Sequence, residues 1–253
     1  MTERERPESP VVERAFLDAN VIRGQQTTDV LLSMASRQVF EPRWTQNVLD
    51  EMRRNRPDGL SAADIDKRIN AMNRAFPDAL TEAPPQGLQD QMHADAKDKH
   101  VLAGAVSSES DVLVTDNIKD FHAPSTGSHA MRVEPLNQFL SRKLHEDPQR
   151  VQGALQDMLK RYKRDPRTIP ALIDAMAEGQ ELQGFAQQLN AVVPEDQRGR
   201  SAALTADLRG TAQYVAFEGI AQPGAPQAPS TAPETRKADA HGMERTKGNE
   251  RDQ

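Results

Sequence analysis

Short apolar runs alternate with helix-forming segments through the first 140 residues, and this alternation constrains the fold more than any other feature. Residues 14–17, 111–115 and 131–133 each have the length and composition of a short buried strand. Between them lie segments with apolar residues at helical spacing, such as residues 65–76. Strands that alternate with helices predict a mainly parallel sheet with helices on both faces, which is an α/β fold.

Residues that favour helix N-termini mark several expected helix starts. Thr45 and Ser61 precede two amphipathic segments of the α/β region, and Asp147, followed by proline, and Thr168 precede two more. Beyond residue 143 the apolar spacing is helical throughout. We therefore expect a small helical C-terminal domain over residues 144–195, packed on the α/β domain because alone it offers little core.

The two ends of the chain differ from the rest in composition. Residues 221–253 contain no Val, Ile, Leu, Phe, Tyr or Trp. Such a segment buries too little apolar surface to offset the entropy lost on ordering. We expect residues 196–253 to form a largely disordered tail and residues 1–10 a flexible N-terminus, which leaves residues 11–143 as the α/β domain.

The composition also bears on the compartment and on the kinds of metal site available. The chain has no cysteine, which excludes disulfides and thiolate ligands and fits a reducing compartment. Residues 1–10 lack the apolar core of a signal peptide, and no apolar run is long enough to span a bilayer. We expect a cytoplasmic protein with no membrane partner.

The net charge of −6 conceals an uneven distribution. Residues 141–168 hold eight Lys and Arg against four Asp and Glu. Such a block either contacts a polyanion or forms a solvated helix face. The same two readings apply to its cluster from Lys160 to Arg164, and to an earlier cluster formed by Arg53, Arg54 and Arg56.

Four acidic side chains fall where the predicted fold brings chain segments together. Asp18 and Asp116 directly follow strands, Glu51 lies on a helix, and Asp98 begins another helix. The carboxyl ends of parallel strands open onto one crevice, so these acids can share it. Clustered carboxylates are unfavourable without a cation, and an all-oxygen set selects Mg²⁺ or Mn²⁺. Taken singly, each acid also has a structural explanation as a turn residue, a helix-start charge or a surface ion pair.

Four segments resemble, in order and in element type, the motifs of PIN domains. They read FLDANV at residues 16–21, VLDEMRR at 48–54, DKHVLAGA at 98–105, and VLVTDN through Asp-Phe at 112–121. The likeness is to VapC-type toxins of bacterial toxin–antitoxin pairs. Residues 147–193 also resemble the helical C-terminal domain of one long subgroup of those toxins.

The resemblance implies a PIN-like three-layer α/β/α fold and cleavage of RNA, often a tRNA or rRNA, that depends on Mg²⁺ or Mn²⁺. It further implies homodimerisation and inhibition by a cognate antitoxin of a type II system. The catalytic carboxylates would be Asp18, Glu51, Asp98 and Asp116, with Asp18, Asp98 and Asp116 holding the metal. A water activated there would attack the phosphorus in line and leave a 3′-hydroxyl and a 5′-phosphate.

Several roles stay open from the sequence. The fourth acid is either Asp116, or Asn117 takes that place with Asp120 helping, and Asp95 competes with Asp98 as ligand. Asn20, Thr115, Asn117 and Asp120 are the expected supporting residues, and Arg53 and Arg54 the expected RNA contacts. The chain would alternatively be a PIN nuclease of RNA maturation or DNA processing without an antitoxin, or a catalytically silent PIN module that binds RNA or protein.

Overall fold

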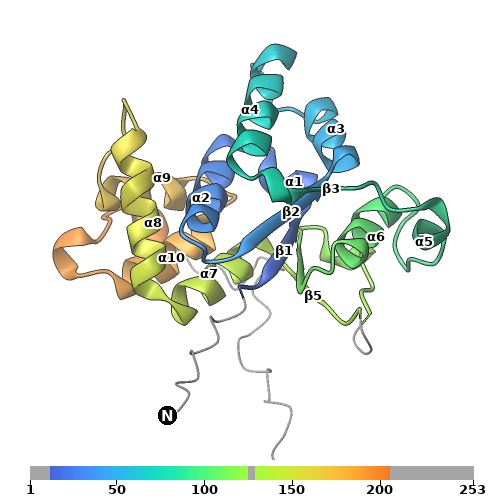
Figure 1. Ribbon diagram of the computed structural model, residues 1–253. Helices are drawn as coiled ribbons and strands as arrows, with labels where there is room; N and C mark the ends of the chain where they lie inside the picture. The colour runs from blue at the N-terminus through green and yellow to red at the C-terminus, as the bar shows by residue number, and fades with distance from the viewer. Residues whose placement is uncertain (1–11, 125–128, 206–253) are drawn as a thin grey trace, which may run out of the picture. The chain divides into compact units, whose positions relative to one another are not determined.

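Five parallel strands form the centre of the structure, in the order β3-β2-β1-β4-β5 (Figure 1). The computed structural model describes residues 12–124 and 129–205. The strands are β1 (Arg14–Leu17), β2 (Glu41–Thr45), β3 (Leu80–Thr81), β4 (Val112–Val114) and β5 (Arg132–Glu134). The predicted parallel sheet and α/β fold class are confirmed.

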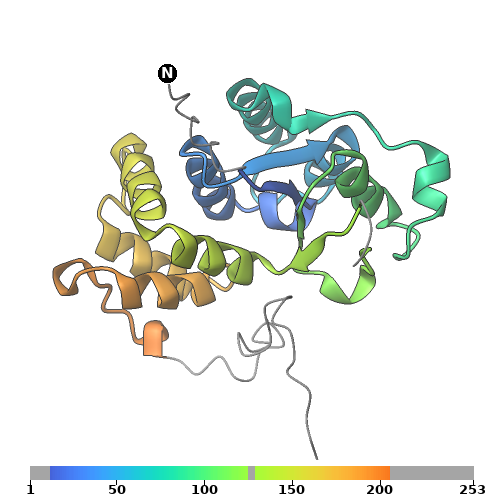
Figure 2. The same ribbon diagram turned by 60° about the horizontal axis from the view of Figure 1, so that its bottom comes forward.

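Helices surround this sheet and continue beyond it (Figures 1 and 2). Within the described ranges the α-helices are α1 (Ala19–Ile22), α2 (Gln25–Ser36), α3 (Gln46–Arg54), α4 (Ala62–Ala75), α5 (Gln86–Asp90), α6 (Lys99–Ser107), α7 (Leu136–Glu146), α8 (Pro148–Arg161), α9 (Ile169–Glu178) and α10 (Gln183–Val192). Helix α6 packs across β1, β2 and β4. Because α6 leads directly into β4, it runs antiparallel to the strands, and its N-terminus lies toward their carboxyl ends, where ligands bind in such sheets.

The close fit of α6 on the sheet depends on Gly104. A Cβ atom added to Gly104 would lie 2.7 Å from Cζ of Phe16 on β1 and 3.1 Å from Cγ2 of Thr45. Phe16 is fully buried, so it has little room to move. Glycine therefore lets α6 approach the sheet closely, and this fixes the position of the N-terminus of α6.

Most of the expected helix starts are confirmed by side-chain caps. Ser61 and Asp64 form a complete capping box at α4. Asp147 accepts a hydrogen bond from the backbone N–H of Arg150 at α8, and Thr168 caps α9 in the same way. Thr45 stands at the N-cap position of α3, but its hydroxyl makes no capping bond and is buried without a partner among the described residues.

Two strands and one long helix were not predicted from the sequence. Strand β2 contains Pro42 between two charged residues, a composition that does not indicate a buried strand. Strand β3 has only two residues, which is too short to carry a periodic pattern. Helix α2 begins with polar residues after Gly24 and has no side-chain cap, so the sequence contains no residue pattern that marks its start.

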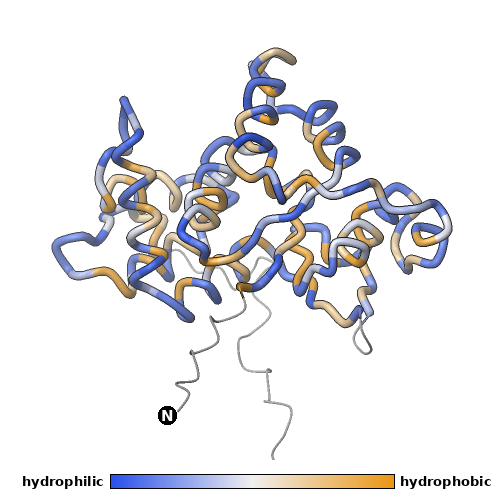
Figure 3. The backbone as a smooth tube through the Cα atoms, viewed as in Figure 1, coloured by the Kyte–Doolittle hydropathy of each residue, from blue (hydrophilic) through white to orange (hydrophobic). Residues whose placement is uncertain are grey.

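The C-terminal helices pack on one another and on the α/β part, as expected for a region with a small core. Helix α8 lies against α2, and α10 lies against α7 and α9. Helix α7 runs through the predicted domain boundary at residue 143. Figure 3 shows hydrophilic residues concentrated at helix ends and in loops.

The domain boundaries predicted from the sequence stay predictions. The structure describes ten residues beyond residue 195, the predicted end of the helical C-terminal domain. Two 3₁₀ turns lie in this part of the chain: η3 (Glu195–Gln197) and, after it, η4 (Ala202–Thr205). The rest of the predicted tail and the predicted flexible N-terminus lie outside the described residues. No helix in the described ranges has both the length and the hydropathy needed to cross a bilayer.

Candidate metal centre

Three chain segments bring acidic side chains to the carboxyl edge of the sheet. Asp18 follows β1 and caps α1, Asp98 precedes α6, and residues 115–120 follow β4. Strands β1 and β4 are paired, with Leu17 opposite Val114, so the segments after them begin side by side. The edge predicted from the sequence is therefore where these groups lie.

Asp18 is nearly enclosed, with 5 % of its surface exposed. Its Oδ2 accepts hydrogen bonds from the Thr115 hydroxyl and the Asn20 amide, both at 2.7 Å, and its Oδ1 accepts from the backbone N–H of Ala19. Burial raises the pKa of Asp18 to about 6, against the opposing effect of the Thr115 hydrogen bond, and the charge of Glu51 raises it further. No basic side chain of the described residues lies within 4.0 Å of this carboxylate, so a proton or a metal ion would neutralise it.

Asp98 and Asp120 are held together by Asn117. The Asn117 amide donates to Oδ2 of Asp98 at 3.3 Å and to Oδ2 of Asp120 at 2.7 Å. Its backbone N–H donates to the Thr115 hydroxyl at 3.1 Å, which links this group to Asp18. Thr115, Asn20 and Asn117 thus form one hydrogen-bonded frame around the carboxylates.

Asp95 joins the same group. One carboxylate oxygen from each of Asp95, Asp98 and Asp120 lies within 4.8 Å of the others. Burial raises the pKa of Asp98; the charges of Asp120 and Asp95 add to this rise, and Lys97 opposes it. The Lys97 ammonium lies 3.7 Å from Asp98 but its side chain is 70 % exposed, so it screens the acids only weakly.

Glu51 reaches this region from α3. Its charge raises the pKa of Asp18, and its Oε2 lies 3.7 Å from Nε2 of His100 on α6. That ring nitrogen is buried without a hydrogen-bond partner among the described residues. Glu51 thus lies beside His100, and not in an ion pair with Arg54, three residues further along α3.

Asp116 points in another direction. Its Oδ1 accepts a hydrogen bond from the backbone N–H of Leu136, at the start of α7. Burial raises the pKa of Asp116, Glu181 raises it further by its charge, and Arg23 lowers it. Asp116 as a metal ligand stays a prediction, and the geometry favours the alternative in which Asn117 and Asp120 complete the group.

The two arginines predicted to contact RNA differ in their surroundings. Arg53 forms ion pairs with Asp50 at 2.5 Å and with Asp66 at 2.6 Å, so two carboxylates of the chain compensate its charge. Arg54 is exposed, and no carboxylate of the described residues lies within 4.0 Å of it. The structure thus leaves Arg54 as the more available of the two.

Sequence reasoning missed Arg23 and Glu181 as neighbours of Asp116. Glu181 lies between α9 and α10, and its Oε2 accepts a hydrogen bond from the Thr27 hydroxyl of α2 at 2.8 Å. No pattern along the chain links positions so far apart. Only the packing of the C-terminal helices brings Glu181 to this place.

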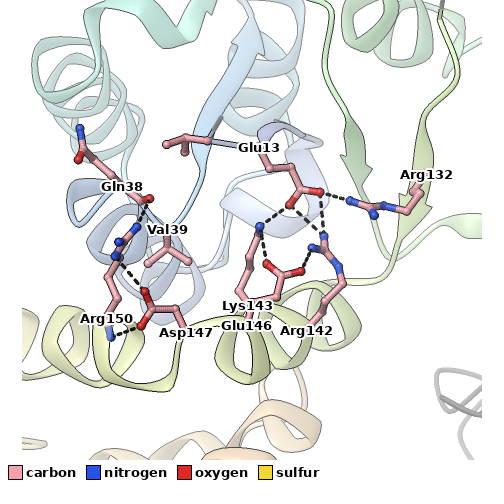
Figure 4. A pocket seen from close by; sticks show the side chains of 10 residues that line it. Glu13, Gln38, Val39, Arg132, Arg142, Lys143, Glu146, Asp147 and Arg150 are labelled. Carbon is pink, nitrogen blue, oxygen red and sulfur yellow. Dashed lines mark hydrogen bonds and ion pairs between the residues drawn. The ribbon is translucent and has the colours of Figure 1, made fainter. Parts of the chain in front are cut away.

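A pocket at the opposite edge of the sheet offers no comparable site. It has a volume of about 340 Å³ (Figure 4). Glu13 pairs there with Arg132, Arg142 and Lys143, and Arg142 also pairs with Glu134. Because the cations are matched by carboxylates, this network ties β1, β5 and α7 together and leaves little free charge for a ligand.

The acidic centre has the chemistry of a divalent-cation site. The ligands that it offers are carboxylate oxygens, with the imidazole of His100 beside Glu51. Hard oxygen donors of this kind suit Mg²⁺ or Mn²⁺ rather than zinc. A parallel α/β sheet with this acidic centre beyond the ends of β1 and β4 defines the class of PIN-domain proteins.

Comparison with known proteins supports the PIN-domain class and points to one subgroup of it. Residues 14–119 match the family model described as PIN domain, and residues 137–191 match the one described as VapC50 C-terminal domain. A relative in Mycobacterium tuberculosis (strain ATCC 25618 / H37Rv), named "Putative ribonuclease VapC50", is 29 % identical over 121 residues. That alignment covers 47 % of this chain and 70 % of the relative. Together these matches support a PIN domain followed by a VapC50-type C-terminal domain, as the sequence motifs predicted.

Proposed function

We propose that this chain is a metal-dependent endoribonuclease and the toxin of a type II toxin–antitoxin pair. One observation carries the proposal: the carboxylates at the sheet edge are buried or grouped, and among the described residues the basic side chains within 4.0 Å of them are the exposed Lys97 and the imidazole of His100. A structural role would not require this unfavourable arrangement. The name of the relative supports ribonuclease chemistry in particular.

Asp18, Asp98 and Asp120 are the residues that would hold the ion; Asp95 lies in one group with Asp98 and Asp120, and Glu51 acts on Asp18 through its charge. A divalent ion held there polarises a phosphodiester and lowers the pKa of a bound water. Asn117 keeps Asp98 and Asp120 together through two hydrogen bonds. Its part is to preserve the spacing of the ligands.

Thr115 and Asn20 orient Asp18. Both donate to the same oxygen, Oδ2, while the Ala19 N–H holds Oδ1. These donors stabilise the ionised carboxylate and so keep it ready for a cation near neutral pH. Glu51 receives no hydrogen bond from Thr115, Asn20 or Asn117. Its carboxylate is therefore the one that would accept the proton of an attacking water.

The partners follow from the proposal. The substrate is RNA, with tRNA or rRNA as the first classes to examine, and a water attack in line leaves a 3′-hydroxyl and a 5′-phosphate. A cognate antitoxin would inhibit by covering the acidic edge. A homodimer in the reducing cytoplasm completes the proposed assembly.

The test is cleavage of total cellular RNA by the purified full chain, with Mg²⁺ or Mn²⁺ and with EDTA. Asp18→Asn and Asp98→Asn remove single charges from the centre, and Asp78→Asn removes one from an exposed position elsewhere as the matched control. Discrete fragments that disappear with EDTA and in the two site variants, but persist in Asp78→Asn, are expected. No cleavage by folded protein freed of antitoxin, with either metal, would favour a silent binding module.

A further inference from the structure

A cationic loop joins α8 to α9 and is not used by the function proposed above. This loop, residues 162–168, carries Lys163, Arg164 and Arg167, all exposed. Within the part of the chain that the structure describes, none of the three has a carboxylate within 4.0 Å. The preceding Lys160, in contrast, pairs with Asp157 at 2.8 Å.

Exposed cations without a carboxylate partner also occur elsewhere in the described residues, as at Arg54 and Arg198, but here three of them lie within one loop. Elsewhere in the described residues, buried cations such as Arg142 and Lys143 are paired with two or more carboxylates. Residues 163–167 hold three cations against one acid, Asp165, and this excess of positive charge attracts polyanions. In Figure 3 the loop at the tip of α8 is coloured as hydrophilic.

The packing of α8 on α2 carries this loop toward the acidic edge. Asp157 on α8 pairs with Arg37 just after α2, and the Tyr162 hydroxyl donates to Asp29 at 2.8 Å, two turns earlier on α2. The two helices therefore run in opposite directions, side by side (Figures 1 and 2). Asp29 lies four residues, or about 6 Å, from the start of α2, which follows the short helix that Asp18 caps.

Two further arginines lie in the stretch between the loop and the acidic centre. Arg23 follows α1 and is exposed, and Arg68 on α4 donates to the backbone carbonyl of Arg23 at 2.8 Å. Among the described residues neither has a carboxylate within 4.0 Å. Free positive charge thus extends from the edge of the acidic centre toward the loop.

A pocket beside the loop has the composition expected of a nucleotide site. Its volume is about 360 Å³. Leu159 and Ile169 supply apolar surface for a base, and Arg167 supplies an unpaired cation for a phosphate, while Lys160 at the rim pairs with Asp157. The lining is completed by Gln156 and Thr168, whose amide and hydroxyl can hydrogen-bond base edges.

We propose that the α8–α9 loop and this pocket form a second RNA-binding site, which anchors substrate backbone away from the cleavage point. The inference rests on the proposed function, because it assumes that the chain acts on RNA. It assigns a role to the C-terminal helical region: this region extends the substrate path along α2 and binds phosphates through Arg164 and Arg167.

The test measures binding of a fluorescein-labelled, mixed-sequence single-stranded RNA to the full chain. All proteins carry Asp98→Asn and contain EDTA, so that cleavage does not interfere. Arg164→Ala/Arg167→Ala is compared with Arg198→Ala/Arg200→Ala, which removes the same charge from exposed arginines of the same region. Thermal melting checks that both double variants fold.

Loss of two phosphate contacts should weaken binding about 10- to 30-fold near 0.1 M salt and reduce the slope of log K against log salt by about 1.4. The control pair should stay within about twofold. Equal affinity of the two double variants would overturn the second site while leaving the proposed function intact, and would assign the loop to an acidic protein partner. Failure of the parent chain to bind RNA at all would instead count against the proposed function.

Discussion

Replacing Asp18 by Asn should stabilise the metal-free protein at neutral pH and destabilise it in acid. The folded protein holds the pKa of Asp18 at about 6, above the ordinary value of 3.8, because the carboxylate is buried. The folded state therefore binds a proton more tightly than the unfolded state does. The free energy of unfolding contributed by Asp18 is larger in acid and is lost as pH rises from about 4 to about 6.

The magnitude follows from this shift and from the hydrogen bonds. Above pH 6 the ionised Asp18 lowers the free energy of unfolding by about 3 kcal/mol, which the Asn variant recovers. The Asn amide would face the two donors, from Thr115 and Asn20, that Oδ2 accepts, and losing these bonds costs about 1 kcal/mol each. The variant should be more stable by about 1 kcal/mol at pH 7.5, and less stable by about 1 kcal/mol at pH 4.5.

Urea unfolding in EDTA, followed by circular dichroism at the two pH values, measures this difference. Asp78→Asn serves as the control, since an exposed carboxylate should show little change. The reasoning is refuted if the stability difference between the parent chain and Asp18→Asn is the same at both pH values. It is equally refuted if the variant is the less stable protein at neutral pH, because the carboxylate would then be compensated.

Three further predictions concern the centre and the core beneath it. Asp120→Ala should reduce RNA cleavage by roughly 100-fold or more, whereas Asp116→Ala should reduce it only severalfold and should weaken the α7 cap by about 1 kcal/mol, because alanine cannot accept the Leu136 N–H; kinetics and urea unfolding of both variants separate the two roles, and equal activities would contradict the assignment. Mg²⁺ or Mn²⁺ at 100 times its dissociation constant should stabilise the parent chain by about 2.7 kcal/mol and Asp98→Asn far less; a melting temperature that metal does not change would count against the site. Gly104→Ala should cost about 1–3 kcal/mol, since its Cβ would meet Phe16, and an unchanged urea midpoint would show that α6 adjusts freely.

Local chemistry made much of the fold predictable. The strand at residues 14–17 is a short apolar run, and it forms β1 in the centre of the sheet. Ser61, Asp147 and Thr168 cap helices because each side chain bonds a backbone N–H three residues later, an interaction complete within one turn. Such features depend on neighbours along the chain, so the sequence is sufficient to identify them.

The acidic edge was predictable for a related reason. Asp18 and the segment from Thr115 follow strands that pair in parallel, and parallel strands bring their carboxyl ends to the same edge. The order of the motifs therefore located the centre without knowledge of side-chain directions.

Side-chain direction was decided by tertiary packing. Asp116 and Asn117 are adjacent in the sequence, yet one carboxylate accepts from Leu136 at α7 while the neighbouring amide bridges Asp98 and Asp120. The sequence places both residues at the edge but does not specify where α7 begins relative to the sheet. Contacts between distant segments determine that, and with it the side chains that face the acidic centre.

Long-range contacts likewise decided the position of the cationic loop. From the sequence alone, the basic cluster in this loop had two interpretations, a contact with a polyanion or a solvated helix face. Tyr162 meets Asp29 across 133 positions of the chain, and this contact directs the end of α8 along α2. The charges are set by composition, but their distance from the acidic centre depends on how two helices far apart in the sequence pack together.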